Sequence, residues 1–133
     1  KGISAARHVL KPGGRIVVLS ECKEGIGSSE FAKMLRTYSG AQGYLDSLWG
    51  TEVRMDQWQL EKLALTALQC ELFYYTPGVR RDQLGSLGLR QYDHPLAAIG
   101  AALTGLGRAS RIAVLPEGPY TFARVLPTAC AWG

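Results

Sequence analysis

The feature that most limits the folds open to this chain is a set of short apolar runs lying between segments of helical periodicity. Such runs occupy residues 16–19, 72–75 and 112–115, and a shorter extended piece lies around 87–90. Continuous apolar runs, rather than alternating ones, are typical of parallel strands that helices cover on both faces. The sequence therefore predicts an α/β fold with three αβα layers and a mostly parallel sheet of about four strands.

Capping residues predict where the longest helix begins. Asp56 and Gln59 have the spacing of a capping box, and Met55 and Leu60 have that of a hydrophobic staple. We expect a helix over residues 56–70. Its apolar residues form one stripe that must pack on the sheet or on another helix.

A second capped helix is expected after residue 92. Asp93 or His94 is the predicted cap, and Pro95 fits the first turn, where its missing N–H costs no hydrogen bond. The residues expected on the buried face of this helix are Leu96, Ile99, Leu103 and Leu106.

Length and composition point to one globular unit. A chain of 133 residues that is 47% hydrophobic can build one core, so we expect residues 1–133 to form a single α/β domain. No apolar run approaches the length that a membrane-spanning helix needs. The net charge is +4, but the basic residues are scattered and form no stripe, so neither nucleic acid nor a membrane is an expected partner.

The cysteines and the first residues of the chain suggest its cellular compartment and its relation to a longer protein. Cys22, Cys70 and Cys130 lack metal-type spacing, and no signal peptide is visible, which favours the cytoplasm. The chain starts at Lys1 rather than at Met, and a helical pattern begins at once. We therefore expect a piece of a longer protein.

Common catalytic and metal-binding patterns are absent from the sequence. His8 and His94 have no partner at ligand spacing, so no metal site is predicted. Cys22 has no base nearby in the sequence, and no Gly-x-Ser-x-Gly motif occurs. We expect no nucleophilic catalysis by this chain alone.

One glycine-rich segment follows the first predicted strand. Gly25, Gly27 and Ser28 come just before a helical pattern, where backbone N–H groups can converge on an anion. The segment lacks the lysine of a phosphate-binding P-loop and the third glycine of a dinucleotide fingerprint. It is a possible anion loop, and the alternative is a tight turn that packs strand on helix.

Two further residues have both a functional and a structural interpretation. Trp58 lies in the first turn of the predicted 56–70 helix but outside its apolar stripe, so its indole faces a loop or a cleft. The alternative is a packing tryptophan. Lys1, taken alone, is typical of a solvated chain end.

Taken together, five motifs in register resemble the C-terminal domain of nickel-dependent lactate racemase and its 2-hydroxyacid racemase relatives. The resemblance covers nearly the whole chain. The motifs are Lys1-Gly2, Pro12-Gly13-Gly14, residues 21–27 followed by Phe31, Gln57-Trp58, and Leu115-Pro116-Glu117-Gly118.

The resemblance implies a role in substrate binding. In that family a larger N-terminal domain holds a nickel pincer nucleotide and the catalytic histidines, and hydride transfer inverts a 2-hydroxyacid. Lys1 matches the lysine that holds the substrate carboxylate, and Trp58 matches a tryptophan near substrate and cofactor. The family's glutamine three positions before that lysine would fall upstream of this chain, and Glu24 stands where many members have Asp.

The expected function is thus that of a C-terminal domain that contributes to the substrate site but is inactive without its N-terminal partner. The nickel pincer nucleotide would be held by that absent domain. An anion- or nucleotide-binding module built on residues 25–29, or a structural interaction domain, is the alternative.

Overall fold

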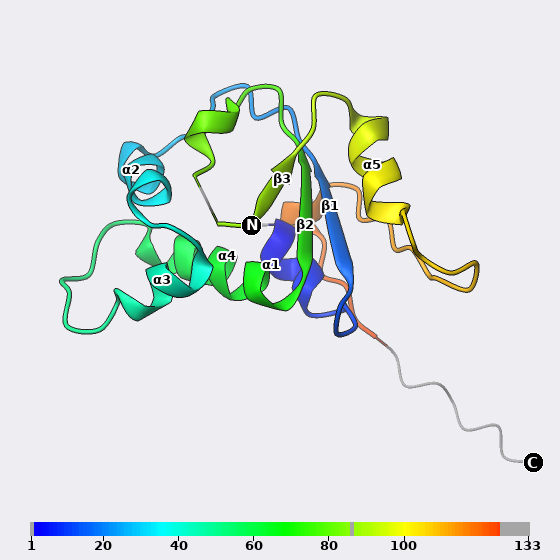
Figure 1. The fold of residues 1–133 in the computed structure, drawn as a ribbon, viewed down its shortest axis with the longest axis horizontal. Helices are drawn as coiled ribbons and strands as arrows, with labels where there is room; N and C mark the ends of the chain where they lie inside the picture. Colours follow the sequence, from blue (N-terminus) through cyan, green and yellow to red (C-terminus); the bar gives the residue numbers. More distant parts are fainter. Residues whose placement is uncertain (1, 86, 126–133) are drawn as a thin grey trace, which may run out of the picture.

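A three-stranded parallel sheet lies at the centre of the computed structural model, which describes residues 2–85 and 87–125 (Figure 1). The strands are β1 (Arg15–Leu19), β2 (Glu71–Tyr75) and β3 (Leu89–Gln91), in the order β1-β2-β3. Val17 is opposite Phe73, which is opposite Arg90. The predicted parallel sheet is confirmed, with three strands in the described residues.

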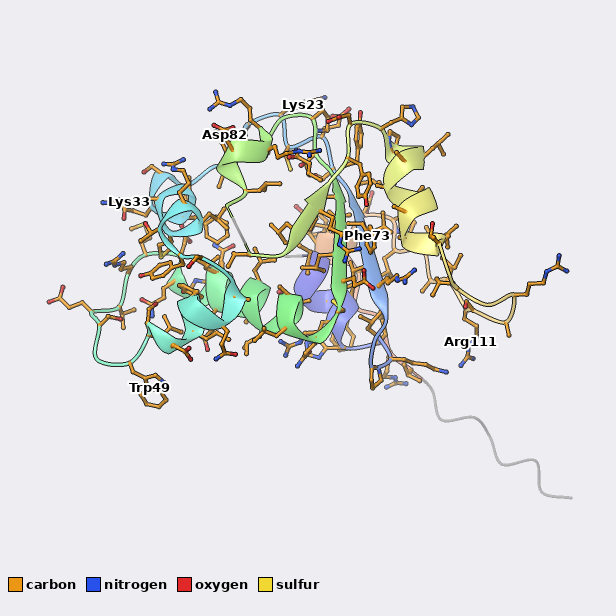
Figure 2. The ribbon with its side chains drawn as sticks, in the orientation of Figure 1. Lys23, Lys33, Trp49, Phe73, Asp82 and Arg111 are labelled. Carbon is orange, nitrogen blue, oxygen red and sulfur yellow. The ribbon has the colours of Figure 1, made fainter. Side chains whose placement is uncertain are left out.

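Helices cover both faces of this sheet, as the apolar runs predicted. On one face, α1 (Gly2–Arg7) and α4 (Gln57–Gln69) pack through their apolar side chains against Ile16, Leu72 and Tyr74. On the other face, α5 (Pro95–Leu103) contacts β1 and β2, and Phe73 points toward it (Figure 2). The αβα layering is therefore confirmed.

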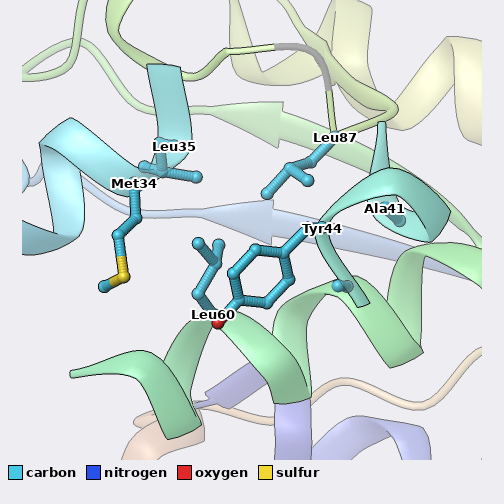
Figure 3. Close-up of a cluster of buried hydrophobic side chains, with 7 residues drawn as sticks. Met34, Leu35, Ala41, Tyr44, Leu60 and Leu87 are labelled. Carbon is cyan, nitrogen blue, oxygen red and sulfur yellow. The ribbon is translucent and has the colours of Figure 1, made fainter. Parts of the chain in front are cut away.

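A second core lies beside the sheet, where α4 meets α2 (Ser29–Thr37) and α3 (Ala41–Asp46). Figure 3 shows the buried side chains converging there; they are Met34, Leu35, Ala41, Tyr44, Leu60, Ala64 and Leu87. The stripe on α4 thus serves two cores. Leu60 and Ala64 face this cluster, and Leu63 packs against both clusters.

The predicted fourth strand at residues 112–115 is wrong. This segment has no strand structure, and Ile112 and Val114 are largely exposed. A β-branched run becomes a strand only where a neighbouring strand completes its hydrogen bonds. No strand in the described ranges pairs with it.

The expected buried face of α5 is also wrong. Its buried residues are Ala98 and Ala102; of the four residues expected, Ile99 is half-buried, and Leu96, Leu103 and the following Leu106 are substantially exposed. Small side chains let a helix approach a sheet closely. Here the larger side chains between the two layers come from the strands that α5 contacts. The predicted cap is confirmed, because His94 Nδ1 accepts a hydrogen bond from Leu96 N at 3.2 Å.

The start of α4 is confirmed, but its expected capping box is not. Asp56 adopts a left-handed conformation with φ 62°, and its carboxylate makes no bond to the helix N–H groups. It accepts instead from Gln59 Nε2 at 2.8 Å. Met55 is mostly exposed, which leaves little of it to form the expected staple.

No helix within the described residues has the length and the apolar composition that crossing a membrane requires.

Candidate functional site

Trp58 lies where a side chain can serve a neighbouring surface. It is the second residue of α4 and 53% exposed, so it is not a core tryptophan. The Lys62 ammonium, one turn further along, stands 4.9 Å from the centroid of the ring. An indole placed like this offers an apolar face with a cation beside it, which suits contact with an anionic organic molecule.

Lys1 lies outside the described residues, but the helix that follows it in the sequence packs near Trp58. α1 contacts α4, the helix that carries Trp58. It also contacts the short 3-10 helix η2 (Gly118–Tyr120). A Cβ atom on Gly2 would lie 3.3 Å from the carbonyl carbon of Gly118, so the two backbones nearly touch.

This contact brings together the first and the last of the five motifs. Glu117, which precedes η2, has φ 54°, a conformation that costs a non-glycine residue roughly 1 kcal/mol or more. The sequence showed that these motifs occur in the same order as in the family, but it did not indicate that they meet in space.

The glycine-rich loop after β1 has the geometry of a tight turn. Gly25 and Gly27 have φ values of 68° and 82°, and Gly25 N donates to Cys22 O at 2.8 Å. Ser28 is the N-cap of α2, and its Oγ accepts from Phe31 N at 3.3 Å. These bonds account for the loop as a turn, and the possible anion site at Gly25, Gly27 and Ser28 stays a prediction.

This loop is tied to the loop that follows β2. Gly78 N donates to Glu21 O at 2.9 Å. A Cβ atom on Gly78 would lie 1.9 Å from Cys22 O, so only glycine fits there. Both loops follow the carboxyl ends of parallel strands, the edge at which α/β proteins commonly bind ligands.

Two open hollows at this edge were missed by sequence reasoning. One, of about 290 Å³, adjoins Arg80 and Tyr75, and the other, of about 570 Å³, adjoins Arg90 and His94. Both are lined by Arg81 and Gln91. Their residues come from separate segments, and no local pattern indicates that they meet.

The cationic groups around these hollows are already partnered. Arg80 pairs with Asp82 at 2.7 Å, and this contact lowers the pKa of the Asp82 carboxyl (Figure 2 shows Asp82 at this end of the sheet). Arg81 Nη2 donates to Gln91 O at 2.8 Å. Arg90 pairs with Glu71 at 2.7 Å. We therefore assign no ligand to these hollows.

The parts of the chain that the structure describes hold no group of three or more His, Cys, Asp or Glu residues able to bind a metal. Cys22 and Cys70 are free, and burial raises the pKa of the Cys70 thiol. The expectation that this chain has no metal site remains a prediction.

The fold and these surfaces define a class: a parallel αβα domain with an exposed tryptophan at a helix start and a tight meeting of its first helix with a distant turn. The family model described as the lactate racemase C-terminal domain matches residues 1–121. The chain belongs to this family.

The chain is also similar to a curated lactate racemase and, in its fold, to a solved structure. The lactate racemase of Thermoanaerobacterium thermosaccharolyticum is 22% identical over 127 residues, which cover 93% of this chain and 30% of the relative. The structure of the lactate racemase apoprotein from that organism matches with a TM-score of 0.69 and 21% identity, over 89% of this chain and 29% of that one. The chain thus spans less than a third of these relatives, and the structural match supports the fold.

Proposed function

We propose that residues 1–133 form one α/β domain that contributes to the substrate site of a cytoplasmic nickel-pincer 2-hydroxyacid racemase or epimerase. The observation that carries the proposal is the half-exposed Trp58 on α4, the helix against which α1, the first described helix, packs. Membership of the lactate racemase C-terminal family supports it.

The donor set of this chain bears on the cofactor. The described residues offer no cluster of metal ligands, so they do not fit the nickel group, which we assign to the N-terminal domain. When bound there, the group supplies hydride transfer at C2 of the hydroxyacid. The residues of this chain act on the rest of the substrate.

Lys1 would hold the carboxylate of the substrate. An ammonium is a compact charge with three donors, so it can stay hydrogen-bonded to the substrate carboxylate. The rest of the substrate can then rotate so that either face of C2 meets the hydride. Trp58 would cover the substrate with an apolar surface and exclude water. A domain with these groups alone positions a hydroxyacid but does not invert it.

Steady-state kinetics of the full-length enzyme with lactate tests both residues. Lys1→Ala should lower kcat/KM by roughly ten- to a hundredfold, as loss of a charged hydrogen bond does, and Lys1→Arg should rescue it in part. Lys33→Ala, an exposed lysine on α2, is the matched control and should leave the kinetics unchanged. Unchanged kinetics in both Lys1→Ala and Trp58→Ala would refute the proposal.

The alternative function, anion or nucleotide binding at Gly25, Gly27 and Ser28, has less support because the Phe31 N–H group, a donor that an anion at this helix start could use, already donates to Ser28 Oγ. Calorimetric titration with inorganic phosphate tests it, with Ser28→Ala as the variant. Binding that is lost in this variant would favour the alternative.

A further inference from the structure

The outer face of α5 is apolar, although it is exposed. None of the nine residues of this helix is charged or polar. Leu96 and Leu103 are 69% and 42% exposed, and Ala97 and Gly100 are exposed as well. We call these four residues the outer stripe of α5. Helices that face water usually carry charged or polar residues on that side, so an apolar outer stripe is typical of a helix that another surface covers.

The residues of the outer stripe share one side of the helix. Leu96, Gly100 and Leu103 are spaced by four and then three residues, which places them above one another on an α-helix. The opposite side carries Ala98 and Ala102, which are buried against the sheet. Figure 1 shows α5 as the outer layer on its side of the sheet, so the outer stripe points away from the strands.

Gly100 lies in the middle of the outer stripe and leaves a gap there. Apart from its neighbours in the helix, no described atom lies within 4 Å of the position that a Cβ atom on Gly100 would take. A glycine at this place lets a second helix approach closely, while Leu96 and Leu103 pack on either side of the contact. Because the two leucines stand at nearly equal spacings from Gly100, the outer stripe can pack against a copy of itself related by a two-fold axis.

The charges beyond the two ends of α5 favour an antiparallel pair. Asp93 directly precedes the helix, Arg108 follows it by a few residues, and both are exposed. No Asp, Glu, Lys or Arg stands between them in the sequence. In two copies packed antiparallel about Gly100, the end with Asp93 lies beside the end with Arg108 of the other copy, and opposite ends of the helix dipoles meet. A parallel pair would bring like charges together.

We propose that α5 is the interface of a homodimer, in which the outer stripes of two copies pack antiparallel about a two-fold axis at Gly100. A contact of this kind needs a self-complementary surface, and the outer stripe offers one, with apolar residues at its centre and charges beyond its ends. The interface lies on the face of the sheet opposite to α4, the helix that carries Trp58. The dimer therefore does not depend on the function proposed for Trp58.

Sedimentation velocity of the full-length enzyme over a range of concentrations tests the dimer. The wild type should sediment as a dimer at the higher concentrations. Leu96→Glu should weaken dimerisation roughly tenfold or more, because the interface would then bury unpaired carboxylates. The change should spare the fold, since Leu96 is largely exposed and an acidic residue suits the first turn of a helix. Lys33→Glu, on the exposed side of α2, is the matched control and should leave the dimer unchanged.

A cysteine at the proposed symmetry axis tests the arrangement of the two copies. Because residue 100 would face its own counterpart, Gly100→Cys in the full-length enzyme should form a disulfide-linked dimer on mild oxidation with diamide. Non-reducing electrophoresis measures the linked fraction. The wild type, which keeps the native cysteines, and Lys33→Cys are the controls, and both should link much less.

Three results would overturn the proposal. A wild type that sediments as a monomer at every concentration would mean that the outer stripe stays open or that the N-terminal domain covers it. A dimer that persists unchanged in Leu96→Glu would place the contact elsewhere on the molecule. Linking of Gly100→Cys no greater than that of Lys33→Cys would exclude the antiparallel packing at Gly100.

Discussion

At the scale of single residues, Tyr44 links the second core to the start of α4. Its ring is buried and meets Tyr38 edge-on at 5.0 Å, and its hydroxyl donates to Gln57 O at 2.9 Å. Burial, and secondarily the charge of Glu61, raises the pKa of Tyr44 to about 12. The residue next to this hydrogen bond is Trp58, so Tyr44 helps to fix the helix end that carries it.

This pKa shift predicts how stability changes at high pH. The tyrosine of the unfolded chain ionises near pH 10, whereas folded Tyr44 ionises near 12, so its contribution is complete below pH 10 and is lost as pH rises toward 12. Tyr44→Phe should cost roughly 1 kcal/mol at neutral pH through the lost hydrogen bond. It should also lose less stability than the wild type between those pH values. Urea unfolding at about pH 8 and about pH 11.5 measures both, and parallel losses in the two proteins would contradict the prediction.

Gly78 supports a second prediction at this scale. Gly78→Ala would force a Cβ atom against Cys22 O, and backbone cannot easily move away, so we expect a loss of roughly 3 kcal/mol or more. Gly100→Ala is the control, because nothing lies within 4 Å of the place that its new methyl group would take on α5, and alanine favours the helix. Thermal unfolding should separate the two clearly; similar midpoints would show that the two loops do not meet as described.

At the scale of elements, one arginine joins the sheet to the end of α5. Arg15 Nη1 donates to Ala102 O at 2.9 Å and to Thr104 O at 2.6 Å, and Arg15 Nε lies 3.4 Å from Glu71 Oε1. The last carbonyl groups of a helix have no partner within it, and a cation near them is favourable. Arg15 therefore holds the outer layer onto β1.

Replacing Arg15 tests this link. Arg15→Met keeps the apolar stem but should cost roughly 1–3 kcal/mol and speed amide exchange in the last turn of α5. Arg90→Met is the matched control, since Arg90 shares Glu71 but its bond to the carboxylate is more exposed, and it should cost less than about 1 kcal/mol. Equal losses, with exchange in α5 unchanged, would rule out the capping role.

At the scale of the whole molecule, the separation of Trp58 from both cores predicts a difference between stability and activity. Trp58→Ala in this chain should cost well under the roughly 3 kcal/mol typical of a core aromatic. In the full-length enzyme the same change should lower turnover. Denaturant unfolding and lactate kinetics measure the two effects, and a loss of stability typical of a core residue would place Trp58 in the core.

The proposed division of function between this domain and an N-terminal domain gives the last prediction. This chain alone should neither bind nickel at one equivalent nor racemise lactate, because metal binding needs a converging set of donors. Titration with nickel, followed by an assay of lactate inversion, checks both. Tight one-to-one binding or turnover would mean that this domain carries chemistry we assign to its partner.

Features that depend on neighbouring residues in the chain were predictable from the sequence. The parallel sheet, the start of α4 next to Asp56, and the His94 cap follow from apolar runs and short-range hydrogen bonds. The position of Trp58 outside the buried stripe of α4 was also predictable, because it depends only on spacing along the helix. Such signals are local, so they can be interpreted without knowledge of the rest of the fold.

Features that depend on a partner surface were decided only by the tertiary structure. Alanines rather than leucines of α5 face the sheet, since the space between layers, not hydrophobicity alone, selects the buried face. The 112–115 run forms no strand because no described strand offers it an edge. The meeting of Gly2 with Gly118 and the hollows at the carboxyl edge join residues far apart in the chain. Burial and hydrogen bonding between distant segments are settled when the elements pack, and no local pattern encodes them.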